Sequence, residues 1–169
     1  DIRLMDKSKA KKSYHFDPEK PVLAILGGSQ GSVPFNMHFR NHLAQYAKSN
    51  IQILWQCGKK DFFDLKELNK QKDVHIIPFT EKMDVFYSSA DLIVSRSGAL
   101  ALSEMALLGK AMVLIPLPHS AGDHQTTNAQ TFSQTGGAVM VHQASLGSGS
   151  LEQTVLGLIQ NSKKIACME

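Results

Sequence analysis

The sequence predicts an α/β fold with a doubly wound, mostly parallel sheet of six strands. Three observations predict it: short apolar runs alternate with helical patterns from Pro21 onward, each run is almost continuously apolar and not alternating, and the connections are short. A strand carries such a continuous run when helices cover both faces of its sheet. Strands that alternate with helices form βα units, and these build an open parallel sheet.

The elements follow one another as six βα repeats. The first strand is the run VLAIL at 22–26, and the helix after it has Pro34 in its first turn, where a proline leaves no hydrogen bond unmade. Further apolar runs of four or five residues predict strands at 51–55, 74–78, 92–95, 112–115 and 138–141. Helical patterns predict helices at 34–48, 61–70, 81–89, 99–108, 124–134 and 151–160.

Length and composition indicate a globular protein. The chain has 169 residues, the size of one ordinary domain, of which 43% are hydrophobic and 20% charged. No apolar run approaches the roughly 20 residues of a membrane-spanning helix. The net charge of +3 is too small to indicate nucleic-acid binding. Cys57 and Cys167 lack CxxC spacing, which disfavours zinc and a disulfide framework and favours a reduced, cytoplasmic setting.

Charge and pattern divide the chain into three segments. Residues 1–20 carry six basic and four acidic side chains, and we interpret them as a basic, solvated linker. A weak attraction to anionic lipid is the alternative interpretation. Residues 21–161 hold all the predicted strands and helices and form the expected ligand-binding domain. Residues 162–169 are expected to form a C-terminal tail.

The first of three polar loops at predicted strand ends is GGSQGS at 27–32. Glycines let backbone N–H groups approach a phosphate, and the start of the following helix favours an anion. The alternative is a tight turn whose glycines only relieve steric crowding. There is no P-loop and no GxGxxG, and the second strand ends in Gln56, Cys57 and Gly58 in place of an acid for an adenosine ribose. A dinucleotide cofactor is therefore disfavoured.

The second loop is SRSGA at 95–99, before the most apolar helix. We expect Ser97 to cap that helix, whose start is another anion site. Glu104, the one charged side chain at 99–108, lies two turns beyond Ser97 on the same face. A carboxylate on an apolar helix needs hydrogen-bond donors, and a ribose diol supplies two. A solvated glutamate on the outer face is the alternative.

The third loop, 116–128, reads PLPHSAGDHQTTN and concentrates side chains that bond sugar hydroxyls. A metal site at His119, Asp123 and His124 is disfavoured because no further acid or cysteine stands nearby. A hydrolase triad is disfavoured because the chain has no GxSxG motif.

Taken together, these motifs resemble a known family. Three motifs stand in this order at strand ends, namely GGSQGSVPFN, SRSGALALSEMALLGKAMVLIPLP and DHQTTNA. They resemble MurG, a family of bacterial N-acetylglucosaminyltransferases. The resemblance runs from about Pro21 to Asn161. It implies one Rossmann-like half of a two-domain GT-B glycosyltransferase, namely the C-terminal half that binds the donor. Residues 1–20 would then be the remnant of the segment between the halves.

The resemblance also implies a function. The family moves N-acetylglucosamine, with inversion, from UDP-N-acetylglucosamine to lipid I to give lipid II, in peptidoglycan biosynthesis and hence in cell-wall biogenesis, cell shape and cell division. The whole enzyme is cytoplasmic and peripheral on the cytoplasmic face of the cell membrane. We expect no cofactor and no nucleic acid partner. We also expect no metal, since DxD is absent and backbone donors can hold the leaving diphosphate.

The resemblance assigns site residues to the four parts of the donor. The diphosphate is assigned to Gly28, Ser29, Gln30, Ser97 and Gly98. The uracil is assigned to Phe79, Thr80 and Met83, and the ribose to Glu104. The sugar is assigned to His124, Gln125 and Asn128. Three positions depart from the family pattern: Ala101 replaces a frequent threonine, Ser32 an alanine, and His124 a second glutamine.

The resemblance implies that the catalytic base belongs to the N-terminal half of the enzymes in this family, so we expect this chain alone to be inactive. The alternatives are a UDP-N-acetylglucosamine 2-epimerase-like enzyme and a non-catalytic UDP-sugar-binding subunit of a split glycosyltransferase. The epimerase family carries SGG-x-QEE where this chain has SGALALSE, which disfavours it. The length of the chain fits the split-subunit interpretation equally well.

Overall fold

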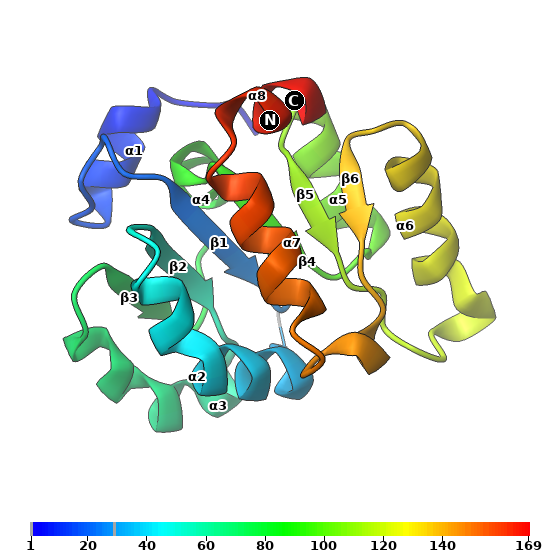
Figure 1. Ribbon diagram of the computed structural model, residues 1–169, viewed down its shortest axis with the longest axis horizontal. Helices are drawn as coiled ribbons and strands as arrows, with labels where there is room; N and C mark the ends of the chain where they lie inside the picture. The colour runs from blue at the N-terminus through cyan, green and yellow to red at the C-terminus, as the bar shows by residue number, and fades with distance from the viewer. Residues whose placement is uncertain (1, 29) are drawn as a thin grey trace. The chain divides into compact units, whose positions relative to one another are not determined.

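Residues 2–28 and 30–169 are described by a computed structural model (Figure 1). Within these residues, six strands form one sheet in the order β3-β2-β1-β4-β5-β6. This is the strand order of a doubly wound α/β fold, and it confirms the predicted fold class. The chain divides into two compact units, Asp1–Asp91 (unit 1) and Leu92–Glu169 (unit 2), each of which contributes three of the strands.

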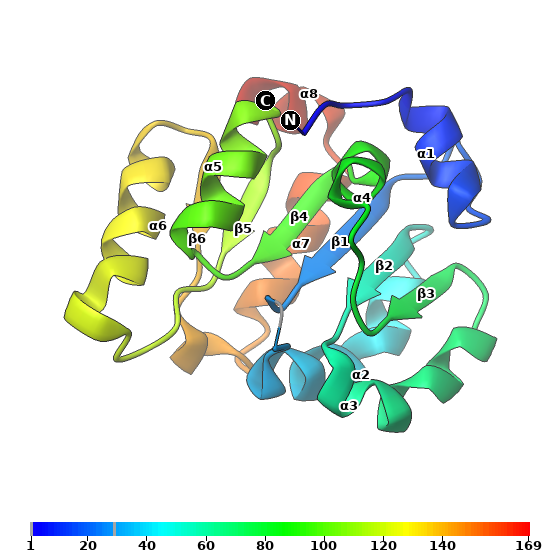
Figure 2. The same ribbon diagram turned by 180° about the vertical axis from the view of Figure 1, so that it is seen from behind.

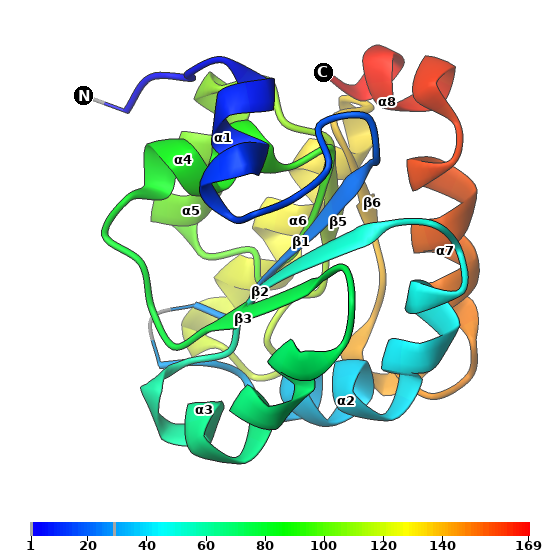
Figure 3. The ribbon, with the colours of Figure 1, turned by 90° about the vertical axis from the view of Figure 1, so that its left-hand side faces the viewer.

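Unit 1 contains the strands β1, β2 and β3, with β2 pairing in parallel with both of its neighbours. Val22 pairs with Gln52, and Ile53 with Val74. Helices α1 and α4 lie on one face of these strands and α2 on the other (Figure 3). The bounds are α1 Lys7–Ser13, β1 Val22–Leu26, α2 Val33–Ala47, β2 Gln52–Gln56, α3 Lys59–Leu65, a 3-10 helix η1 Lys66–Lys70, β3 Val74–Ile77 and α4 Met83–Ser89.

The core of unit 1 explains why β1 has no polar face. All five residues of β1 are buried, as the continuous apolar run requires for a strand covered on both faces. Trp55 of β2 is fully buried and packs against Phe39 of α2, with ring centroids 6.0 Å apart. Its indole N–H donates to Asn36 Oδ1 at 3.2 Å, so that the buried polar atom is bonded.

Unit 2 contains the strands β4, β5 and β6, with β5 parallel to both neighbours. Met112 pairs with Ile93 on one side and with Ala138 on the other. Helix α5 lies on one face of these strands and α7 on the other (Figures 1 and 2). The bounds are β4 Leu92–Ser95, α5 Ala99–Leu107, β5 Met112–Leu114, η2 Ala121–Asp123, α6 His124–Gln134, β6 Ala138–Met140, η3 Gln143–Ser145, α7 Ser150–Ile159 and α8 Ser162–Met168.

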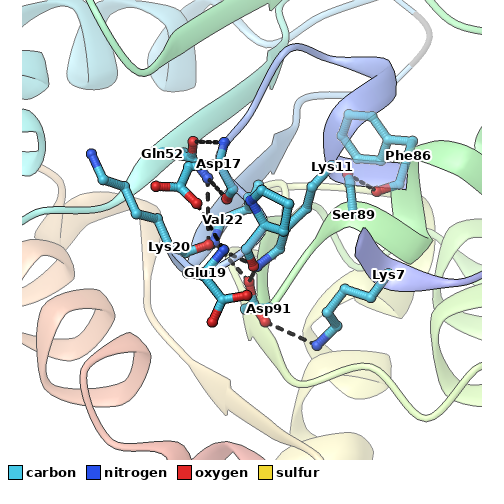
Figure 4. A network of polar contacts seen from close by, with 11 residues as sticks. Lys7, Lys11, Asp17, Glu19, Lys20, Val22, Gln52, Phe86, Ser89 and Asp91 are labelled. Carbon is cyan, nitrogen blue, oxygen red and sulfur yellow. Dashed lines mark hydrogen bonds and ion pairs between the residues drawn. The ribbon is translucent and has the colours of Figure 1, made fainter. Parts of the chain in front are cut away.

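The N-terminal segment, expected to be a solvated linker, contains α1, which is anchored to the rest of unit 1. Lys7 and Lys11 each place Nζ 2.9 Å from a carboxylate oxygen of Asp91 (Figure 4). The same carboxylate accepts the backbone N–H of Val22 at 2.8 Å. Burial raises the pKa of Asp91, but these hydrogen bonds outweigh it and the net pKa is lowered. Lys11 is itself buried and also donates to the Lys20 carbonyl oxygen at 2.7 Å.

The predicted strands and helices of residues 21–161 are present, and apart from one helix their observed bounds differ from the predicted bounds by two residues or fewer. The predicted helix 61–70 is instead α3 followed by the 3-10 helix η1. Two α-helices of the described residues were not predicted, α1 and α8, the latter in the segment 162–169, and neither were the short 3-10 helices η2 and η3. Among the described residues, no helix is both long enough and apolar enough to cross a membrane.

Candidate functional site

The glycine-rich loop after β1 packs against the end of β2 backbone to backbone. Gly28 and Gly31 have φ values of +86° and +77°, which favour glycine. A Cβ on Gly31 would stand 2.2 Å from the carbonyl oxygen of Cys57, so the position has no room for a side chain. The turn and close-approach explanation is therefore sufficient for Gly31. The predicted phosphate residue Ser29 lies outside the described residues, and Gln30 is exposed.

Gln56, the last residue of β2, connects two of the predicted loops within unit 1. Its Nε2 donates to the Gly28 carbonyl oxygen at 3.4 Å, and its Oε1 accepts the backbone N–H of Thr80 at 3.1 Å. In the sequence, Gln56 indicated only that no acid stands at this position. A buried amide at the end of an apolar strand must find partners, and this signal was available in the sequence.

Asn36 fixes the start of α2 to the same end of β2. Its Nδ2 donates to the Cys57 carbonyl oxygen at 2.8 Å and to Asp61 Oδ2 at 2.6 Å. Since its Oδ1 accepts from Trp55, all polar atoms of the Asn36 amide take part. The loop between β1 and α2 is thus held at its helical end by a buried side chain.

The three predicted uracil residues follow β3. Phe79 is 39% exposed, Thr80 is half-buried with its N–H on Gln56, and Met83 is the first residue of α4. Lys59 places Nζ 5.8 Å from the centre of the Phe79 ring. A cavity of about 550 Å³ is lined by Gln30, Val33, Lys59, Lys60 and Phe79. The structure of unit 1 therefore brings a predicted phosphate residue and a predicted uracil residue to one cavity of ligand size.

In unit 2, Ser97, Gln125 and Asn128 form one hydrogen-bonded group. The Ser97 hydroxyl donates to the Gln125 carbonyl oxygen at 2.7 Å, and Asn128 Nδ2 donates to the Ser97 carbonyl oxygen at 3.1 Å. Gln125 Oε1 accepts the backbone N–H of Leu117 at 3.0 Å. The expectation that Ser97 caps α5 is wrong: Gly98 is the N-cap residue, and the Ser97 hydroxyl is used by Gln125.

Arg96 holds the loop after β5 and was not singled out by the sequence analysis. Its Nη1 donates to the carbonyl oxygens of Ile115 and Pro116 at 3.0 and 3.1 Å, and its Nη2 donates to Gln143 Oε1 at 2.6 Å. Burial lowers the pKa of Arg96 to about 10, which leaves the guanidinium charged at neutral pH. The backbone that leads toward Gln125 is therefore fixed by a charged side chain.

Glu104 and His124, two further predicted residues, lie on α5 and α6 of unit 2. Glu104 is half-buried. On the same helix, Leu102 and Met105 are buried, whereas Ser103 and Ala106 are exposed. His124 is exposed at the first position of α6, and its Nδ1 pairs with the Ala121 carbonyl oxygen.

Comparison with known proteins identifies the family. Residues 22–169 match the glycosyltransferase family 28 C-terminal domain. The chain is 38% identical over 142 residues to the UDP-N-acetylglucosamine--N-acetylmuramyl-(pentapeptide) pyrophosphoryl-undecaprenol N-acetylglucosamine transferase of Flavobacterium psychrophilum, covering 84% of this chain and 39% of that protein. It is 36% identical over 162 residues to the enzyme of the same name from Cytophaga hutchinsonii, covering 94% of this chain and 43% of that protein.

A solved structure agrees with these sequence matches. The crystal structure of MurG from Acinetobacter baumannii superimposes with a TM-score of 0.76 at 28% identity, covering 99% of this chain and 48% of that one. The chain thus spans less than half the length of each of these three relatives. Because the family match covers nearly all of it, the chain belongs to the glycosyltransferase family 28 C-terminal domain family.

Proposed function

We propose that this chain binds UDP-N-acetylglucosamine and is the donor-binding part of an N-acetylglucosaminyltransferase of peptidoglycan synthesis. The names of its relatives support this donor. The observation that carries the proposal is the cavity of about 550 Å³ in unit 1, lined by both Gln30 and Phe79. An exposed aromatic ring and a glycine-rich loop at one cavity suit a base followed by phosphates.

Each predicted residue keeps its role in this proposal. Phe79, Thr80 and Met83 bind the uracil, and Glu104 accepts hydrogen bonds from the ribose hydroxyls. Gly28, Ser29 and Gln30 bind the diphosphate, as does the backbone of Ser97 and Gly98 at the start of α5. His124, Gln125 and Asn128 bind the sugar. The Ser97 hydroxyl already donates to the Gln125 carbonyl oxygen, so Ser97 contributes its backbone only. Gln125 Oε1 already accepts from Leu117, so Gln125 contributes its Nε2 donors.

The acceptor in this proposal is N-acetylmuramyl-(pentapeptide) pyrophosphoryl-undecaprenol, as in the names of the relatives. It is bound at the cytoplasmic membrane surface by the part of those proteins that this chain does not match, which also supplies the general base. The chain itself holds the donor and stabilises the departing diphosphate with backbone N–H groups, which is electrostatic catalysis.

Isothermal titration of the 169-residue chain tests the donor. We expect UDP-N-acetylglucosamine to bind with a measurable heat and ADP to bind at least about tenfold more weakly, a difference of about 1.4 kcal/mol. Equal affinity for ADP would contradict a uridine site, and the absence of any heat with UDP-N-acetylglucosamine would overturn the proposal.

A transfer assay with a lipid I analogue tests the division of labour. We expect no product from the chain alone, because an acceptor without a facing domain is not oriented, and orientation is worth about 7–11 kcal/mol. Multiple turnovers by the purified chain would place the base within it, and His119 and His124 would be the first residues to replace.

A further inference from the structure

Gln56 is a buried amide whose two polar atoms serve two different loops. The side chain is 2% exposed, at the carboxyl end of β2. Its nitrogen donates to the Gly28 carbonyl oxygen and its oxygen accepts the Thr80 N–H, so the orientation of the amide is fixed by its partners. Among the natural side chains of this length, a carboxylate can make only the second of these bonds and an aliphatic chain neither.

The strand end that carries Gln56 is itself firmly held. The next residue, Cys57, donates its N–H to the Ile77 carbonyl oxygen at 3.0 Å, and its own carbonyl accepts from Asn36. A Cβ on Gly58 would stand 2.6 Å from the Gly31 Cα, so the backbones of the two turns are in direct contact. The backbone at Gln56 is therefore held in place, and the hydrogen bonds of its side chain place the Gly28 and Thr80 loops relative to the end of β2.

We infer that Gln56 is a positioning residue that couples the phosphate loop at Gly28 to the base loop at Thr80, so that a nucleoside diphosphate is bound by both loops at once. This inference rests on the proposed function. A ligand that spans two loops gains affinity when their separation is set in advance, whereas a ligand that touches one loop gains little. Gln56 also fixes the direction of the Gly28 carbonyl, an acceptor that would repel a phosphate oxygen.

The same strand provides a matched control, Gln52. It is 0% exposed at the other end of β2, where its Oε1 accepts the Asp17 N–H at 2.7 Å and its Nε2 donates to the Asp17 carbonyl at 2.9 Å (Figure 4). Gln52 and Gln56 thus share residue type, strand, burial and a two-sided hydrogen-bonding pattern. They differ in which segments they hold, so Gln52→Met reproduces the loss of stability without touching the predicted loops.

The experiment is calorimetric titration of wild type, Gln56→Met, Gln56→Glu and Gln52→Met with UDP and with uridine. We expect Gln56→Met to weaken UDP about tenfold and uridine less than about threefold, since two buried hydrogen bonds are lost but uridine needs only the base loop. Gln56→Glu keeps the acceptor for Thr80, so uridine affinity stays at the wild-type value while UDP affinity falls. Gln52→Met leaves both affinities within about twofold, although it unfolds at lower denaturant concentration.

The other outcomes each overturn something definite. Wild-type UDP affinity in a folded Gln56→Met or Gln56→Glu protein overturns the inference, and so does an equal loss for UDP and uridine, which would confine Gln56 to the base loop. If Gln56→Met does not fold, Gln56→Glu decides by the same comparison of the two ligands. Failure of the wild-type chain to bind UDP would instead contradict the proposed function, and the inference with it.

Discussion

Gly31 and Gly58 face each other so closely that neither position accommodates a side chain. A Cβ on Gly31 would lie 3.1 Å from the Gly58 Cα, and a Cβ on Gly58 would lie 2.6 Å from the Gly31 Cα. Both residues have positive φ, +77° and +89°. Glycine is thus required twice at this contact, for conformation and for space, and the turns after β1 and β2 act as one packed structure.

Gly31→Ala is expected to lower the free energy of unfolding by about 3 kcal/mol or more. A left-handed conformation costs an alanine about 1–2 kcal/mol, and overpacking against the Cys57 carbonyl adds about 1–3 kcal/mol. Urea unfolding followed by circular dichroism measures the loss. Gly147→Ala is the control, because Gly147 has φ +100° with nothing within 4 Å of its Cβ position. A loss as small as that of the control would show that the contact relaxes freely.

Asp91→Asn is expected to destabilise the protein by about 2 kcal/mol at pH 7, since hydrogen bonds to charged groups contribute about 1.5–3 kcal/mol. The folded pKa of Asp91 lies below its unfolded value, so its contribution is present above the unfolded pKa of about 3.9 and is lost as the pH falls through the lower folded value. The unfolding free energies of wild type and Asp91→Asn should therefore begin to converge as the pH falls below about 4 and should coincide only below the folded pKa of Asp91. The exposed Asp64, changed to Asn, is the control, and an Asp91→Asn difference independent of pH would contradict the ion pairs with α1.

Glu104→Gln is expected to weaken UDP binding by about tenfold or more while the fold stays intact. Charge-assisted hydrogen bonds to a ribose diol contribute about 1.5–3 kcal/mol each, and the amide lacks the charge. Calorimetry with UDP measures the effect, and circular dichroism checks the fold. Glu67→Gln, on the exposed η1 helix, is the matched control. Unchanged affinity in a folded Glu104→Gln protein would remove Glu104 from the ribose site.

Gln125→Glu and Gln125→Ala are both expected to weaken UDP-N-acetylglucosamine but to spare UDP. The glutamate keeps the acceptor for the Leu117 N–H, so the loop stays in place and only the Nε2 donors are lost. The alanine loses both. Titration with the two ligands separates the roles, because equal losses for UDP and UDP-N-acetylglucosamine would assign Gln125 to the nucleotide.

The strands were predictable because a local pattern determines them. β1 and β4 begin and end where predicted, since their apolar runs are continuous and each stops at a polar or glycine position. Helix α1 was not predicted, because KSKAKKS has no apolar periodicity. It is held by ion pairs with Asp91, which is 84 positions away from Lys7, and no local pattern reports such a partner.

The candidate site shows the same division. The sequence identified the loops, and the structure of unit 1 brings Gln30 and Phe79 to one cavity. The sequence did not show which polar atoms already have hydrogen-bond partners within the protein. Ser97 was expected to cap its own helix, yet its hydroxyl bonds a carbonyl 28 positions later. Gln56 was overlooked for the same reason, since its partners come from two other segments of unit 1.

Cys57 makes this end of unit 1 a chemical reporter of its own opening. The thiol is 0% exposed, and burial raises its pKa to about 11, so the reactive thiolate is scarce. The Cys57 Sγ donates to the carbonyl oxygens of Gly58 and Ile77 at 3.5 Å, so a thiol reagent reaches it only when this end of β2 opens, which is a local unfolding event. Alkylation at Cys57, compared with the exposed Cys167 in the same sample, therefore measures how often this end of β2 opens, and a ligand bound at the Gly28 loop is expected to slow it.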